Sequence, residues 1–188
     1  MPTGILLAQA PRGMIRVLRE DEMNTVRHLT LILLLLSSQP VLAQEEATFT
    51  TRSLTPDSAL VAARAALASC RAAGFQVAVA VVDRMGVLQV LIRDRYAGAH
   101  TPETARRKAW TAASFRTNTS EMLELTAAGN PQAGIRHLDN VAIIGGGIMI
   151  ESAGSLVGAI GVSGAPGGDR DDTCAIAGIE AIEDALAF

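Results

Sequence analysis

The chain has 188 residues, of which 49% are hydrophobic and 19% charged, so it is long enough for one domain with a sizeable core and too apolar to be disordered throughout. The formal net charge is −3 and no broad basic patch stands out. This argues against nucleic acid as a main partner.

The first 43 residues have the three-part pattern of a secretory signal. Residues 23–28 are a short basic stretch, residues 29–36 are mostly apolar, and Val41-Leu42-Ala43 ends the segment with small or apolar residues. The apolar run is shorter than the roughly 20 residues needed to span a bilayer. We therefore interpret residues 1–43 as an N-terminal extension and signal peptide cleaved after Ala43, with Met23 as the start. An uncleaved membrane anchor is the alternative. After processing we expect a periplasmic or secreted protein without a stable membrane span.

Residues 44–53 are polar and are predicted to be a flexible leader before a domain over residues 54–188. Thr55 is suited to cap a helix, and Pro56 fits the first helical position. Apolar residues then recur at helical spacing until Gly74, which is typical of a helix end. The first helix is therefore predicted between Thr55 and Gly74.

Two β-branched segments follow. Gln76–Asp83 and Val87–Arg93 flank a short turn and predict a β-hairpin. Both strands are partly apolar on both faces, so we expect the sheet to be covered on both sides or used in assembly. Thr101-Pro102-Glu103 repeats the earlier start pattern and predicts a second helix that ends near Phe115.

The C-terminal half is predicted to contain further helices and strands. They are a third helix over Asn118–Ala127, strands over Val141–Ile144, Ile148–Glu151 and Ser155–Val162, and a last helix from Asp171 to about Ala187. Gly154 can supply the positive φ of the tight turn between the last two strands. The order α-β-β-α-α-β-β-β-α indicates an α/β (α+β) fold with an antiparallel sheet flanked by helices.

The last predicted strand carries Gly158, Gly161 and Gly164, and glycines inside a strand suggest close approach by a helix, a subunit or a flat ligand. The segment LVGAIGVSGAPGGDRDDTCAIAGIEAI resembles the closing segment of the GlcG/HbpS family of haem-binding proteins, which is related to the C-terminal domain of PduO-type proteins. The resemblance extends upstream through QVAVAVVDRMGVLQVLIRD and ARRKAWTAASFRTNT. It implies a five-stranded sheet with the first and last helices side by side on one face. It also implies reversible, non-covalent binding of haem or a related tetrapyrrole.

Given that resemblance, His100 and His137 are the candidate iron ligands, because they are the histidines left after processing. For each of them, a solvated loop histidine is the alternative. The family segment also carries a threonine, for which Thr111 and Thr117 are the candidates here. A neutral hydroxyl is a poor iron ligand, so a threonine contact would imply exchangeable haem. No C-x-x-C-H run is present, which excludes the usual covalent attachment.

The second predicted helix could contribute further haem contacts. Arg106 and Arg107 can pair with propionates, because a guanidinium matches a carboxylate in a bidentate fork. Trp110 and Phe115 could cover the porphyrin face. The alternative is an ordinary amphipathic helix, with the charges on its outer side and the two aromatic rings in the core.

Cys70 and Cys174 fall near the end of the first helix and the start of the last. If those helices are antiparallel, the two residues can meet in a disulfide, which persists in an exported protein. Two buried free thiols are the alternative. A metal site at the pair is not expected, since no histidine lies at ligand spacing.

The acidic cluster of Asp169, Asp171 and Asp172 is interpreted as helix capping. No phosphate loop or nucleophile elbow is present, so whether the protein is an enzyme stays open. We expect a homo-oligomer that binds haem or a small molecule. The rivals are a small-molecule or haem-degrading enzyme, for which His137 beside Asp139 is the best acid–base pair, and a ligand-free assembly module.

Overall fold

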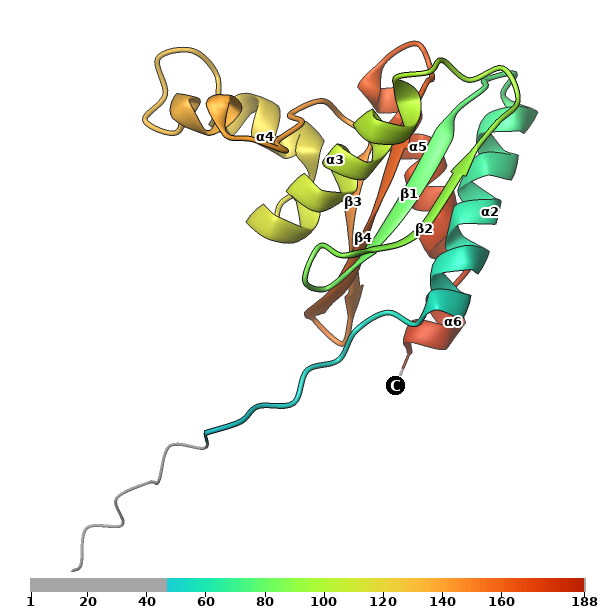
Figure 1. Ribbon diagram of the computed structural model, residues 1–188, viewed down its shortest axis with the longest axis horizontal. Helices are drawn as coiled ribbons and strands as arrows, with labels where there is room; N and C mark the ends of the chain where they lie inside the picture. The colour runs from blue at the N-terminus through green and yellow to red at the C-terminus, as the bar shows by residue number, and fades with distance from the viewer. Residues whose placement is uncertain (1–46, 188) are drawn as a thin grey trace, which may run out of the picture. The chain divides into compact units, whose positions relative to one another are not determined.

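Four strands pair in one antiparallel sheet in the order β2-β1-β4-β3 (Figure 1). Their bounds are β1 Ala78–Asp83, β2 Leu88–Arg93, β3 Gly147–Ser152 and β4 Ser155–Ser163. The computed structural model describes residues 47–187, and the compact unit begins at Thr50. The predicted signal peptide, and residues 44–46 of the predicted leader, lie outside the described residues.

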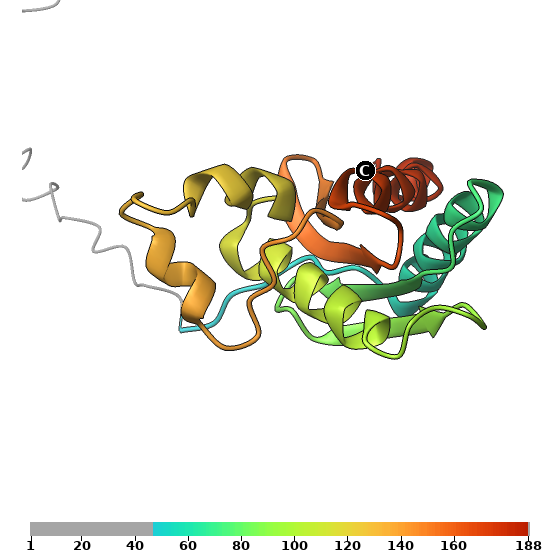
Figure 2. The ribbon, with the colours of Figure 1, turned by 90° about the horizontal axis from the view of Figure 1, so that it is seen from above.

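Helices cover both faces of this sheet. Helix α2 (Pro56–Ala72) and helix α5 (Gly168–Glu180) lie side by side on one face, as the resemblance implies, and helix α3 (Thr101–Phe115) covers the other (Figures 1 and 2). The shorter elements are α4 (Thr119–Leu125), the 3-10 helix η1 (Ala133–His137) and α6 (Glu183–Leu186). Within residues 47–187, no helix combines the length and the hydrophobicity needed to cross a membrane.

The strand register sorts the side chains onto two different faces. Val79 lies opposite Val162 and Val81 opposite Ile160, and all four belong to the core beneath α2 and α5. We call this side the aliphatic face. The alternate positions of the same strands carry small residues and pack against α3; they are Ala78, Ala80, Ala159 and Gly161. We call this side the alanine face.

Helices α2 and α5 are antiparallel and very close. Gly178 of α5 has no room for a side chain, because a Cβ there would lie 2.7 Å from the carbonyl oxygen of Ala62. Nearer the start of α5, Cys174 is joined to Cys70 by a disulfide, with 5.5 Å between the two Cα atoms. Of the two alternatives that the sequence leaves open for these cysteines, the structure contains the disulfide.

Several predicted boundaries are confirmed. Thr55 is the N-cap of α2, and its Oγ1 accepts a hydrogen bond from the backbone N–H of Ser58 at 3.3 Å. Helix α3 runs from Thr101 to Phe115 as predicted. The β3–β4 turn has positive φ at both Ala153 (49°) and Gly154 (71°), which is the geometry of a tight hairpin turn that matches the twist of its strands.

The predicted strand Val141–Ile144 is wrong, so the sheet has four strands rather than five. The segment crosses α3 instead, where the backbone N–H of Ala142 donates to the Thr111 hydroxyl at 3.0 Å. Asn140 before it has a φ of 66°, which turns the chain away from an extended path. The last helix also differs from its prediction, because it begins at Gly168 and ends at Glu180, before the separate helix α6.

Candidate functional site

A cleft of about 600 Å³ opens at the end of the sheet where β1 begins and β4 ends. Ala78 of β1 is paired with Ser163 of β4, so the segments that adjoin these strand ends are neighbours. The cleft is lined by residues from four parts of the chain. They come from residues 74–76 after α2, from residues 96–108 before and in α3, from Ile144, and from residues 163–171 between the end of β4 and the first turn of α5.

His100 lies at the rim of this cleft, directly before α3. Its ring packs over Gly98, because a Cβ at Gly98 would lie 2.7 Å from His100 Cε1. The Thr101 hydroxyl donates to the Gly98 carbonyl at 2.8 Å and fixes the same turn. A glycine two residues before the histidine therefore makes room for an imidazole that is exposed to the cleft.

Lys108 and Asp171 form the inner end of the cleft lining. The Lys108 ammonium donates to Asp171 Oδ2 at 2.8 Å and to the Val162 carbonyl at 2.9 Å. Both residues are buried, at 1% and 3% exposure. Burial raises the pKa of the Asp171 carboxyl above its ordinary value, although the ammonium beside it acts in the opposite direction.

The interpretation of the acidic cluster as helix caps is wrong, although Asp169 and Asp171 do lie in the first turn of α5, where the helix dipole favours a carboxylate. The N-cap of α5 is Gly167, and no side chain caps it. Asp171 Oδ1 accepts from the backbone N–H of Ala165 at 3.1 Å, and Asp172 Oδ1 accepts from that of Gly146. Burial raises the pKa of the Asp172 carboxyl as well. These two carboxylates fasten neighbouring chain segments rather than their own helix.

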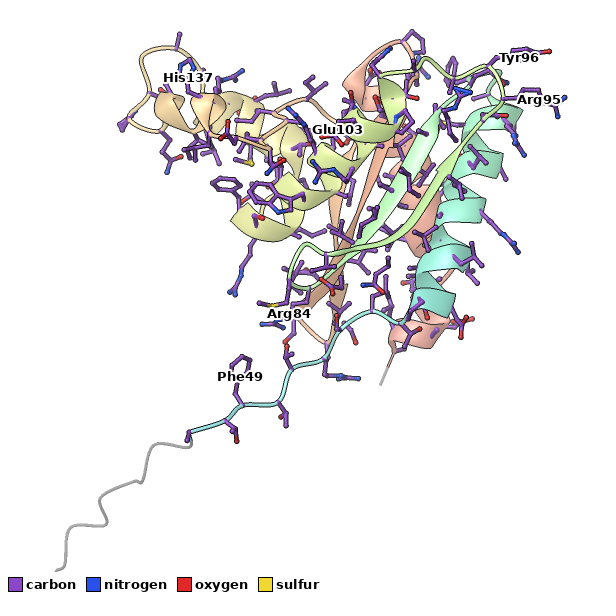
Figure 3. All side chains as sticks on the ribbon, viewed as in Figure 1. Phe49, Arg84, Arg95, Tyr96, Glu103 and His137 are labelled. Atoms are coloured by element: carbon purple, nitrogen blue, oxygen red, sulfur yellow. A yellow bond between two sulfur atoms is a disulfide. The ribbon has the colours of Figure 1, made fainter. Side chains whose placement is uncertain are left out.

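The two candidate histidines do not share a site. His137 is exposed at the end of η1 and is absent from the cleft lining. Figure 3 shows it at the opposite end of the view from Tyr96, which lines the cleft with His100. Asp139, its proposed acid–base partner, is exposed too. Among the described residues, no group of three histidine, cysteine or acidic side chains is arranged to hold a metal ion.

Arg106 and Arg107 both bind Glu103, at 2.8 Å each, on the outer side of α3. Arg106 also donates to the side-chain oxygen of Asn140 at 3.0 Å. The two guanidinium groups lower the pKa of Glu103 to about 2. The structure therefore brings the two arginines together, but on a carboxylate of the protein itself.

The remaining predicted contacts are engaged within the fold. Trp110 is half-buried and covers the β1–β2 turn, where a Cβ at Gly86 would lie 3.0 Å from Trp110 Cδ1. Thr111 is fully buried and accepts the hydrogen bond from Ala142. The Thr117 hydroxyl donates to the Phe115 carbonyl at 3.1 Å. None of these three residues lines the cleft.

The pair of Lys108 and Asp171 was not among the residues predicted to form a site. The pattern that could have found it is the spacing of Ala105, Ala109 and Ala112 on α3. Residues three, four and seven apart share one face of a helix, and this puts Lys108 on the buried stripe of alanines. A lysine at a core position needs an acidic partner, and α5 provides it.

Comparisons with known proteins agree with this arrangement of elements. A profile described as "Haem degrading protein HbpS-like" matches residues 54–180. The crystal structure of a double mutant of HbpS from Streptomyces reticuli is similar with a TM-score of 0.69 and 35% identity, over 78% of this chain and 98% of that one. The crystal structure of a PduOC:Heme complex is similar with a TM-score of 0.66 and 31% identity, over 69% of this chain and 95% of that one.

Among curated proteins, the corrinoid adenosyltransferase PduO of Salmonella typhimurium is 34% identical over 103 residues. The match covers 54% of this chain and 31% of the relative. The chain therefore spans only about a third of the length of the curated relatives that it matches.

Proposed function

The chain belongs to the HbpS-like family, and from that premise we propose that it binds haem, reversibly and without a covalent bond, in the cleft beside His100. Two similarities support the proposal. The family is described as haem-degrading, and one similar structure is a haem complex. The observation that carries the choice of site is the His100 imidazole at the rim of a cleft of about 600 Å³.

The residues present fit such a ligand. The cleft volume lies within the range of about 300–1,000 Å³ that is typical of small-molecule sites. Phe75, Tyr96 and Ile144 contribute apolar surface to the lining. An imidazole nitrogen is a common haem-iron ligand, and the ring of His100 lies directly over Gly98 at the cleft. Bound haem would supply the redox and Lewis-acid chemistry of its iron, while the protein supplies orientation and partial exclusion of water.

The disulfide supports two further parts of the proposal. The chain has two cysteines, and they are bonded to each other, so neither is available for a thioether bond to a haem vinyl group. Disulfides also form and persist mainly in oxidising compartments. Together with the predicted signal peptide, this supports export to the periplasm or the outside of the cell.

We also propose that the protein is a homo-oligomer. Strand β2 lies at an edge of the sheet, and it exposes Leu88 and Leu91 at 40% and 42%. Edge strands with exposed apolar residues readily pair with another chain. A second copy that covers this edge would bury both leucines.

The test is a titration of the purified protein with haemin, followed by the Soret band. We expect saturable binding with a shifted Soret maximum at micromolar haemin. The variant His100→Ala should lose the shift, while the matched variant His137→Ala should bind as the wild type does. Wild-type binding by both variants would show that the site does not lie beside His100. Loss of binding in His137→Ala alone would assign the iron to η1.

Haem breakdown is a second candidate function. Asp171 favours it, because a carboxyl with a raised pKa that lines a cleft is a typical acid or base of an active site. Incubation of the haem complex with hydrogen peroxide distinguishes the two functions. A degrading enzyme should lose the Soret band faster than free haemin does, and faster than its Asp171→Asn variant. A binding protein should keep the band at least as long as free haemin.

A further inference from the structure

Lys108 and Asp171 form an ion pair inside the protein, at the inner end of the cleft that contains His100. Desolvation of two buried charges offsets most of their attraction, so such a pair gives little net stability compared with apolar side chains. The rest of the buried stripe of α3 consists mainly of alanines, so apolar packing is already in use here. Stability therefore does not explain why these two charges are buried here.

The pair fastens three parts of the chain to one another. Lys108 comes from the middle of α3 and donates to the carbonyl of Val162 near the end of β4. Asp171 comes from the first turn of α5, and its second oxygen accepts from the backbone N–H of Ala165. One buried contact thus connects the central helix of the alanine face, the end of a central strand and the start of α5.

The segment 164–168 that this contact holds is one wall of the cleft. Gly164 and Gly167 have φ values of 134° and 124°, a conformation that glycine adopts without strain. No side chain caps α5 at Gly167. Besides the bond from Ala165 to Asp171, two backbone hydrogen bonds involve the segment: the Gly167 N–H donates to the Ala165 carbonyl at 2.8 Å, and the Asp171 N–H donates to the Gly167 carbonyl at 3.3 Å. Both stay within residues 165–171, so neither ties the segment to α3. Its position relative to α3 therefore depends on Asp171.

We propose that Lys108 and Asp171 are positioning residues for the ligand of this cleft. The pair sets the distance between the wall 164–168 and the opposite rim that carries His100, and so determines how tightly a flat ligand is held between them. This inference rests on the proposed function, because haem is the ligand on which it is tested. Neither residue is assigned a contact with the iron.

The experiment compares three variants: Lys108→Met, Asp171→Leu, and the double variant with both changes. Each single change leaves one charge buried without its partner and should lower the unfolding temperature. The double change leaves no buried charge, so it should recover most of the unfolding temperature. We expect haemin affinity to stay about tenfold or more below wild type in the double variant, because the wall is no longer fastened. Wild-type affinity in the folded double variant would overturn the inference.

Hydrogen exchange in the absence of haemin provides a second measurement. The backbone N–H groups of Gly164, Ala165, Gly167 and Gly168 should exchange faster in the double variant, or in Asp171→Asn if the double variant does not fold. Ile160→Val, which loosens the aliphatic face, should not change them and controls for a loss of stability alone. Unchanged exchange in the pair variants overturns the inference even if the cleft binds haem.

If His100→Ala binds haemin normally, the site in the proposed function fails, while the exchange result still decides whether the pair holds the wall.

Discussion

The two faces of the sheet are packed by different means. On the aliphatic face, branched side chains of β1, β3 and β4 fill a thick layer beneath α2 and α5. On the alanine face, α3 rests almost directly on the strands, and a Cβ at Gly161 would overlap the carbonyl oxygen of Ala105. The first face gains stability from buried apolar area, whereas the second depends on close fit. The candidate site adjoins the helix that is held by fit.

The two kinds of packing differ in how far they can adjust to a change in shape. A thick layer of aliphatic side chains tolerates small changes in shape, because neighbouring side chains can move. Where the backbone of a helix packs directly on the backbone of a strand, no side chain can move to absorb such a change. The position of helix α3 on the sheet is therefore fixed. The positions of His100 at its start and of Lys108 at its centre are fixed with it. Close packing is the physical reason why this helix can position a site.

The largest effect is expected on the aliphatic side, from removal of the disulfide. The double variant Cys70→Ala/Cys174→Ala should lose about 4 kcal/mol of unfolding free energy, because the bond closes a loop of 104 residues. Urea unfolding measures the loss, and reduced wild-type protein is the control that should show a similar decrease. Haemin binding well below the unfolding temperature should persist, since the cleft lining includes neither cysteine. An unchanged urea midpoint would show that this face does not need the bond.

A smaller effect is expected from a single methyl group on the alanine face. The variant Gly161→Ala should lose about 2–3 kcal/mol, because its Cβ would overlap Ala105 O and lie 2.7 Å from the backbone nitrogen of Ala109. The matched control is Gly134→Ala, where nothing lies within 4 Å of the added atom. That control should stay within about 0.5 kcal/mol of wild type. Similar values for the two variants would contradict the close packing of α3 against the alanine face.

The smallest effect is expected from acid, at the ion pair that joins the end of α2 to the segment after β2. Arg71 donates two hydrogen bonds to Asp94, at 2.7 and 3.0 Å, and lowers the pKa of that carboxyl. Because the folded pKa lies below the unfolded value of about 4, the stabilisation is complete above that value and is lost as the pH falls through the folded pKa.

Unfolding temperatures measured from about pH 6 to pH 2 test this ion pair. The variant Arg71→Ala should be less stable than wild type at pH 6, and the two should converge in acid. Arg64→Ala, which changes an exposed arginine of the same helix, should run parallel to wild type throughout. A constant difference between Arg71→Ala and wild type would mean that the pair does not titrate as described.

Local patterns determined most of the elements of this fold. The Thr55-Pro56 start, the β-branched run that became β1 and the Thr101–Phe115 helix were predicted closely, because capping, proline and side-chain periodicity act within a few residues. The pairing of the first and last helices also followed from the resemblance of the sequence to a known family. The segment 141–144 was wrongly predicted to be a strand, because its run of apolar residues also fits the pattern of a short strand.

Only the tertiary structure decided which of those residues form a site. It placed the backbone of residues 141–144 on the Thr111 hydroxyl, separated His100 from His137, and bonded Arg106 and Arg107 to Glu103. It also joined Lys108 to Asp171 across 63 positions of the chain. A sequence shows which groups can ionise or donate. Which of them meet depends on the packing of α3 and α5 against the sheet, and that packing is a long-range property of the chain.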